Sequence, residues 1–174
     1  MTWNIDAMHS HVTFSVRHML VSTVKGKFNV LSGTLNIDEA NPANSSIEAE
    51  VDAASIDTSE PNRDKHLSSP DFFDVEKYPK ITFKSTKVEP TGDNEYKVTG
   101  DLTLHGVTKP VVFGVEYSGE IKDPYGFRRA GLSAKTKISR KEWGLTWNSL
   151  LETGGAIVSD EVKIEIDLAA VTKA

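Results

Sequence analysis

Apolar and polar residues alternate along most of this chain, and that pattern is typical of strands with one face against a core. The alternation is clearest in six segments, at residues 12–17, 47–53, 96–104, 111–117, 132–138 and 162–168. Turns rich in Pro, Gly, Asn or Asp separate several of them, at residues 41–44, 90–94 and 122–127. We also expect short strands at residues 3–5 and 81–83, and one strand at residues 24–37 that bends at glycines.

About eight strands without a long helical segment predict an all-β fold, either a sandwich or an up-and-down barrel. The barrel is favoured, because pairing of the first and last strands would remove both edges of the sheet. We therefore expect an eight-stranded antiparallel barrel. Its 174 residues suit a single domain over residues 1–174.

Residues 55–85 break the alternation and predict a long flap. The first half is polar, and the second half carries the aromatic pair Phe72-Phe73. A connection of this length is usually either functional or disordered. Thr58 or Ser59 is expected to cap a short helix that has Pro61 in its first turn. A second helical turn near residue 70 would carry the two phenylalanines. The flap is then either a lid over a cavity or a surface connection whose phenylalanines plug the core.

The second break in the alternation is at residues 139–153. Ser139 and Glu142 have the spacing of a capping box, in which a serine side chain caps a helix and a glutamate three residues later bonds back. We therefore expect a short helix there that carries Trp143, followed by Trp147.

Composition excludes several kinds of protein. The net charge of -5 does not suit nucleic acid, because phosphate binding needs a basic surface. There are no cysteines for disulfides or thiol chemistry, and no apolar run reaches the length of a membrane span, so no stable membrane insertion is expected. The N-terminus lacks a basic start followed by an apolar run. We expect a cytoplasmic protein, or a periplasmic or secreted one if an export signal was removed.

Side chains on one face of the predicted strands would line the barrel interior. In a barrel of about eight strands this space is filled by side chains or holds one small ligand. Several inward positions carry small residues, such as Ala49, Gly100 and Ala134, so the interior is either an apolar ligand cavity or a packed core. The residues expected to line the lumen are Phe14, Val16, Phe28, Val30, Val51, Phe72, Phe73, Phe83, Leu102, Phe113, Ile138, Trp143, Trp147 and Ile164.

A series of short motifs, in order along nearly the whole chain, resembles the YceI-like family of lipocalin-like, polyisoprenoid-binding proteins. They are His9-Ser10, FSVRH at 14–18, VKGKF at 24–28, SIDT at 55–58, RDKHL at 63–67, DFFD at 71–74, YPKITF at 78–83, GDLTLHGVT at 100–108, and Ser139-Arg140 with Trp143-Gly144. The resemblance implies a lipocalin-like antiparallel barrel that holds a long isoprenoid chain in its lumen. It implies no cofactor besides that lipid.

If the chain binds such a lipid, the polar head would lie near a barrel mouth. The candidates to contact it are Arg17, His18, Arg63 and His66. Guanidinium groups suit phosphate oxygens, although a charged, solvated surface would also explain these residues. Two histidines at positions 9 and 11 lack a third metal ligand nearby in sequence, so no metal site is expected.

We therefore expect a non-enzymatic protein that carries or sequesters a long-chain isoprenoid of the polyprenyl quinone, alcohol or phosphate type. One alternative is a barrel enzyme that acts on an amphipathic substrate through His66 and Asp64 as an acid–base pair. Another is a packed barrel that serves as an interaction module. A homodimer formed through its outer faces is possible in that case.

Overall fold

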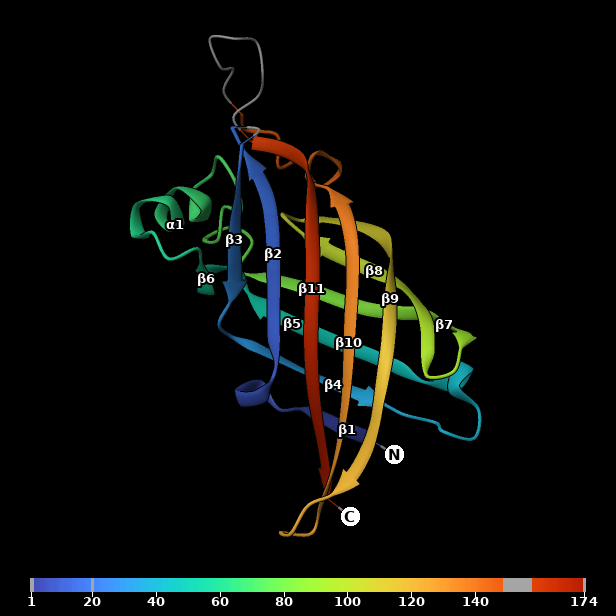
Figure 1. The fold of residues 1–174 in the computed structure, drawn as a ribbon. Coiled ribbons are helices and arrows are strands. Elements are labelled where there is room, and N and C mark those ends of the chain that lie inside the picture. Colours follow the sequence, from blue (N-terminus) through green and yellow to red (C-terminus); the bar gives the residue numbers. More distant parts are fainter. Residues whose placement is uncertain (1, 20, 149–157, 174) are drawn as a thin grey trace.

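Antiparallel strands form one sheet that closes on itself (Figure 1). The structure is a computed structural model that describes residues 2–19, 21–148 and 158–173. Its strands are β1 (Thr2–Ile5), β2 (His11–His18), β3 (Ser22–Phe28), β4 (Leu31–Asn36), β5 (Ser46–Asp52), β6 (Ile56–Asp57), β7 (Lys80–Gly92), β8 (Glu95–Leu104), β9 (Val107–Lys122), β10 (Phe127–Ser139) and β11 (Val158–Lys173). Its helices are α1 (Pro61–Ser68) and the 3-10 turns η1 (Ala7–His9), η2 (Pro42–Asn44), η3 (Ala53–Ser55) and η4 (Arg140–Trp143).

The sheet closes through β11, the last strand. The order β1-β4-β5-β7-β8-β9-β10-β11 is completed by pairing of β1 with β11, which gives a ring of eight strands. The earlier part of β11, from Val158 to Asp167, pairs along the same edge with β2, and β3 and β6 continue the sheet from there. The prediction of an eight-stranded antiparallel barrel with a flap and short helices is confirmed.

Two stretches of the chain that run along the sheet are each divided into two shorter strands. β1 and β2 both lie along β11 and are separated by η1, while β3 and β4 are separated by a turn of two residues. The single bent strand predicted at residues 24–37 is therefore two strands, one paired with β2 and the other with β1.

The turn between β3 and β4 also overturns the prediction for Val30. Its amide donates to Ser55 Oγ and its carbonyl accepts from the Asp52 amide, so Val30 crosses from one strand to the next. Half of its surface is exposed, whereas Leu31 is buried. Two turn residues move the inward position from Val30 to Leu31, so Val30 faces solvent.

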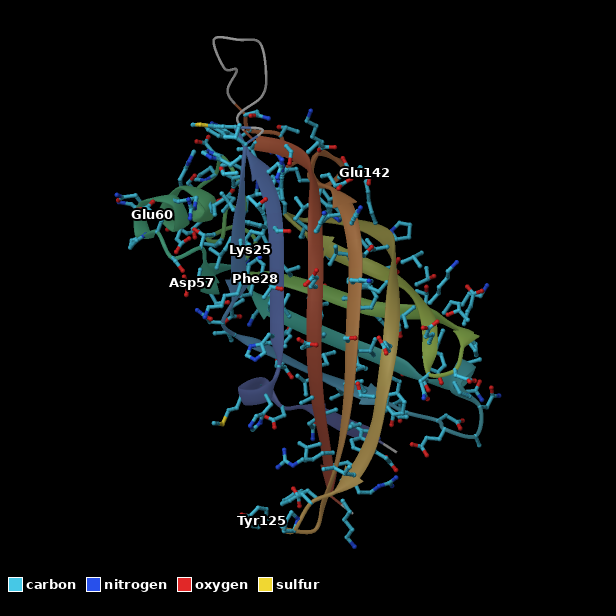
Figure 2. The ribbon with its side chains drawn as sticks, in the orientation of Figure 1. Lys25, Phe28, Asp57, Glu60, Tyr125 and Glu142 are labelled. Carbon is cyan, nitrogen blue, oxygen red and sulfur yellow. The ribbon has the colours of Figure 1, made fainter. Side chains whose placement is uncertain are left out.

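The flap follows β6 and contains one helix, α1, at the side of the barrel (Figure 1). Its cap is Glu60, which is labelled in Figure 2 and accepts hydrogen bonds from the amides of Asn62 and Arg63. The prediction that Thr58 or Ser59 caps the helix is thus wrong. Residues 70–73 form hydrogen-bonded turns without a second helix.

A short 3-10 turn, η4, carries Trp143 as predicted, but the expected capping box is absent. Ser139 makes no side-chain bond to the helix and instead donates to Asp160. Gly144 ends the turn with a φ of 79°, in the left-handed region that glycine adopts without strain. No helix in the described parts of the chain is both long and apolar enough to span a membrane.

Candidate ligand-binding site

The barrel encloses a cavity of about 520 Å³, a volume typical of small-molecule sites. Its wall is mostly apolar and takes residues from β2, β3, β4, β5, β7, β8, β9, β10 and β11. The barrel is therefore hollow, which contradicts the packed-core alternative.

Most of the residues predicted to line the lumen lie on the cavity wall. They are Phe14, Val16, Phe28, Val51, Phe72, Phe73, Phe83, Leu102, Phe113, Ile138 and Ile164. Strand alternation put them there, because every second side chain of a barrel strand points inward. Leu35, Ile81, Val98 and Leu132 share the same face and also line it, although they were not among the predicted residues.

The two tryptophans do not line the cavity, which corrects their assignment. Trp143 is 1% exposed and packs in a cluster with Leu104 and Leu145, where its indole Nε1 donates to the Leu102 carbonyl at 3.0 Å. Trp147 packs edge-on against the rings of His66 and Phe72. Both tryptophans support the barrel end from outside the lumen.

The flap closes one side of the cavity with three apolar residues, Leu67, Phe72 and Phe73. The ring of Phe73 packs edge-on against Phe28 of β3, with centroids 5.9 Å apart, and Phe28 in turn contacts Phe14. Figure 2 labels Phe28 on β3. The flap phenylalanines therefore form part of the cavity wall, as the lid interpretation of the flap predicts.

The four predicted head-group residues lie off the cavity wall. Arg63 donates from Nε to Thr58 Oγ1 at 2.8 Å and from Nη2 to the Thr58 carbonyl at 2.7 Å, so it holds the start of the flap. Arg17 is exposed and donates to Thr23 Oγ1. His18 ends β2. The structure places no member of this set where it would meet a ligand in the lumen.

His66 and Asp64 do not form an acid–base pair. Asp64 Oδ1 accepts from the amide and hydroxyl of Thr58, whereas His66 Nε2 lies 2.9 Å from Asp71 Oδ2. Their partners are six and five positions away along the chain, Thr58 for Asp64 and Asp71 for His66, so the two side chains do not meet each other. The residue pair proposed for the enzyme alternative is therefore wrong.

Polar residues gather at one part of the cavity wall, which we call the rim: Asn36, Asp38, Glu39, Asn94 and Tyr117. The Tyr117 hydroxyl donates to Glu39 Oε1 at 3.4 Å. Burial, together with the nearby carboxylates of Glu39 and Glu120, raises the pKa of Tyr117 to about 12. Tyr117 therefore stays a neutral donor, and the rim carries negative charge.

Arg140 is the single Lys or Arg among the described residues of the cavity wall, and it is only 4% exposed. It donates to the carbonyls of Leu145 at 2.6 Å, Trp147 at 3.0 Å, Ser159 at 2.9 Å and Val158 at 3.3 Å. Burial lowers the pKa of Arg140, and the carboxylate of Asp160 opposes that shift. Arg140 was not among the residues predicted to line the lumen.

Metal binding has no support in the described ranges, which contain no group of three or more His, Asp or Glu side chains arranged around a common point. His9 lies in η1 and its Nδ1 is 2.7 Å from Asp6 Oδ2, while His11 begins β2. The two histidines thus belong to different elements.

Comparison with known proteins agrees with this architecture. The model of the YceI-like domain matches residues 3–170, almost the entire chain. The chain belongs to the YceI-like family. A UPF0312 protein of Vibrio cholerae is 44% identical to this YceI-like protein over 137 residues, which are 79% of this chain and 72% of the relative.

Solved structures share the YceI-like barrel. BcnA of Burkholderia cenocepacia superposes with a TM-score of 0.84 at 27% identity, covering 95% of this chain and 98% of BcnA. A polyisoprenoid binding domain from Saccharophagus degradans, implicated in plant cell wall breakdown, has a TM-score of 0.71 over 97% of both chains. Its 17% identity shows a common fold.

Proposed function

We propose that this protein binds a long-chain isoprenoid lipid in the barrel cavity and carries or sequesters it without changing it chemically. The observation that supports the proposal most is the cavity of about 520 Å³, which has an apolar wall on the barrel strands and the flap. A prenyl chain is a long hydrocarbon, and such a wall offers it contact along its length. The polyisoprenoid binding domain of the same fold adds support for this class of ligand.

The hydrocarbon chain would supply most of the affinity. Burial of roughly 400 Å² of apolar surface at about 25 cal/mol per Å² contributes about 10 kcal/mol. Association costs at least about 4 kcal/mol in lost translational and rotational freedom. The difference, about 6 kcal/mol or less, corresponds to dissociation constants of tens of micromolar or weaker. Longer chains should bind more tightly, up to the length that the cavity holds.

A matched pair of substitutions tests the proposal. Ala134 is buried on the cavity wall, whereas Val112 lies on the neighbouring strand and has 49% of its surface exposed. Ala134→Trp should fill part of the cavity and abolish uptake of a radiolabelled C20 prenyl alcohol. Val112→Trp should bind the alcohol like the parent.

Melting curves of both variants would show that each is folded. Full uptake by a folded Ala134→Trp variant would mean that the lipid does not occupy the lumen. Failure of the parent protein to bind prenyl alcohols of any length would refute the proposed function itself.

A further inference from the structure

Arg140 is an unusual residue for the wall of an apolar cavity. It follows Ile138 at the end of β10, and Leu145 and Val162 lie on the same part of the wall. A charged side chain that is 96% buried is costly unless hydrogen bonds and charges compensate for its lost hydration. The environment of Arg140 provides only part of that compensation.

Within the described residues, the hydrogen bonds of Arg140 use four of its five donors. A guanidinium has five N–H groups, and those of Arg140 make four bonds to backbone carbonyls. Nη1 and Nε are fully used, but Nη2 donates once, to the Val158 carbonyl at the long distance of 3.3 Å. Its second hydrogen meets no acceptor in residues 2–19, 21–148 and 158–173.

The charge of Arg140 is also not directly paired. None of the ion pairs formed by the described residues includes it. The nearby Asp160 carboxylate accepts from the Ser139 hydroxyl and the Lys141 amide instead. This end of the cavity therefore has a positive potential, which a dry, apolar environment strengthens.

The rim, at the other part of the wall, has the opposite sign. Tyr117 pairs with Leu132 of β10, and its hydroxyl binds Glu39. Leu132 and Ser139, the last residue of β10 before Arg140, are seven residues apart, which corresponds to about 23 Å at about 3.3 Å per residue. The cavity thus runs from an acidic rim to a buried cation over the length of an extended prenyl chain.

This arrangement selects among head groups. A phosphate would have to pass the acidic rim, lose its hydration, and share a single free donor, so two or more of its oxygens would stay unpaired. An alcohol oxygen could accept from the same donor, but its hydroxyl hydrogen would then need an acceptor where Arg140 already engages the nearby carbonyls. A neutral carbonyl oxygen needs one donor and gains from the positive potential.

We propose that Arg140 anchors an uncharged head that presents a carbonyl oxygen, and that the prenyl chain runs from Arg140 toward the rim. This inference rests on the proposed function, because it names the head and the direction of a lipid in the same cavity. It assigns to Arg140 the role that the sequence suggested for Arg63.

The first test uses the unmodified protein. A C20 prenyl ketone with a ¹³C-labelled carbonyl is bound, and its C=O stretch is compared by infrared difference spectroscopy with that of the ketone in alkane. A hydrogen bond from a guanidinium should shift the stretch to lower frequency. An unshifted stretch in the bound ketone would overturn the inference.

The second test determines whether the head of the ligand binds at Arg140 or at the rim. In Arg140→Lys, three ammonium hydrogens must serve four carbonyls, so none remains for the ligand. We expect this variant to bind the ketone about tenfold or more weakly, and to bind the C20 prenyl hydrocarbon like the parent. Tyr117→Phe probes the rim. Val112→Thr is the control that should leave both affinities unchanged, because Val112 lies off the cavity wall and is 49% exposed.

The outcomes distinguish the two proposals. Equal weakening of the ketone and the hydrocarbon by Arg140→Lys would assign Arg140 a purely structural role. Weakening of the ketone by Tyr117→Phe alone would place the head at the rim, and tighter binding of the C20 prenyl phosphate than of the ketone would refute the carbonyl class. If the parent binds neither ketone nor hydrocarbon, the proposed function fails, and this inference with it.

Discussion

Phe28 provides the most demanding single-residue test of the inward register. Its ring lines the cavity and contacts Phe14 at 5.6 Å and Phe73 of the flap at 5.9 Å between centroids. Phe28→Asp would remove both aromatic contacts and place a carboxylate against an apolar wall. Val30→Asp is the matched control, because Val30 is only two residues away and faces solvent.

The expected loss in the free energy of unfolding follows from these contacts. Two aromatic pairs contribute about 0.5–1.5 kcal/mol each, and burial of the ring contributes about 1.5–3 kcal/mol when complete. Loss of a core phenylalanine costs about 3–5 kcal/mol in all, and the carboxylate adds its own desolvation. Val30→Asp should change the free energy of unfolding by no more than about 0.5 kcal/mol, as surface substitutions do.

Urea unfolding at neutral pH measures both variants against the parent. We expect a midpoint far below that of the parent for Phe28→Asp and a nearly unchanged midpoint for Val30→Asp. The same samples should show lost uptake of prenyl alcohol for Phe28→Asp only. Equal losses of stability, or a stable Phe28→Asp protein that still takes up lipid, would show that the register of β3 is wrong.

Three further predictions concern the flap, the strand packing and acid stability. Prenyl ligand should slow hydrogen exchange at residues 61–73 more than in β11, because the flap contributes to the cavity wall and such elements open easily; equal slowing would contradict a lid. Gly100→Ala should lower the free energy of unfolding by about 1–3 kcal/mol in urea, because the added Cβ would lie 2.5 Å from the Lys84 carbonyl oxygen; an unchanged midpoint would refute that packing. The hydrogen bond to His9 lowers the pKa of Asp6 below its usual value of 3.8. The ionised carboxylate therefore stabilises the fold fully at pH values above 3.8, and this stabilisation is lost as the pH falls through the lower pKa of the folded state. Asp6→Asn should therefore be less stable than the parent near neutral pH, and the gap should close in acid; a gap independent of pH would contradict this.

Strand alternation predicted the barrel and most of the cavity wall, because every second residue of a barrel strand must face inward. It failed at Val30, since a turn of two residues restarts the alternation at Leu31. No local signal marks that turn, whose formation depends on pairing of β3 with β2 and of β4 with β1. The error is one of tertiary context rather than of periodicity.

Polar site residues were harder to predict. Arg63 and His66 looked available for a ligand, but Thr58 and Asp71 engage them within the flap, and such contacts depend on how α1 ends and turns. Arg140 was missed although it continues the inward series of Leu132, Ala134 and Ile138, because a charge at an inward position is not expected in an apolar wall. The homodimer and the cytoplasmic location stay predictions.

Native mass spectrometry of the freshly purified protein, followed by organic extraction of the same sample, tests the central claim most directly. A protein that holds a prenyl lipid in its lumen should appear as a complex heavier than the 19.1 kDa chain, and the extract should contain an isoprenoid of the matching mass. The Ala134→Trp variant, prepared in parallel, should lack the added mass, whereas Val112→Trp should retain it. A bare chain that takes up no prenyl lipid when one is supplied would contradict the account.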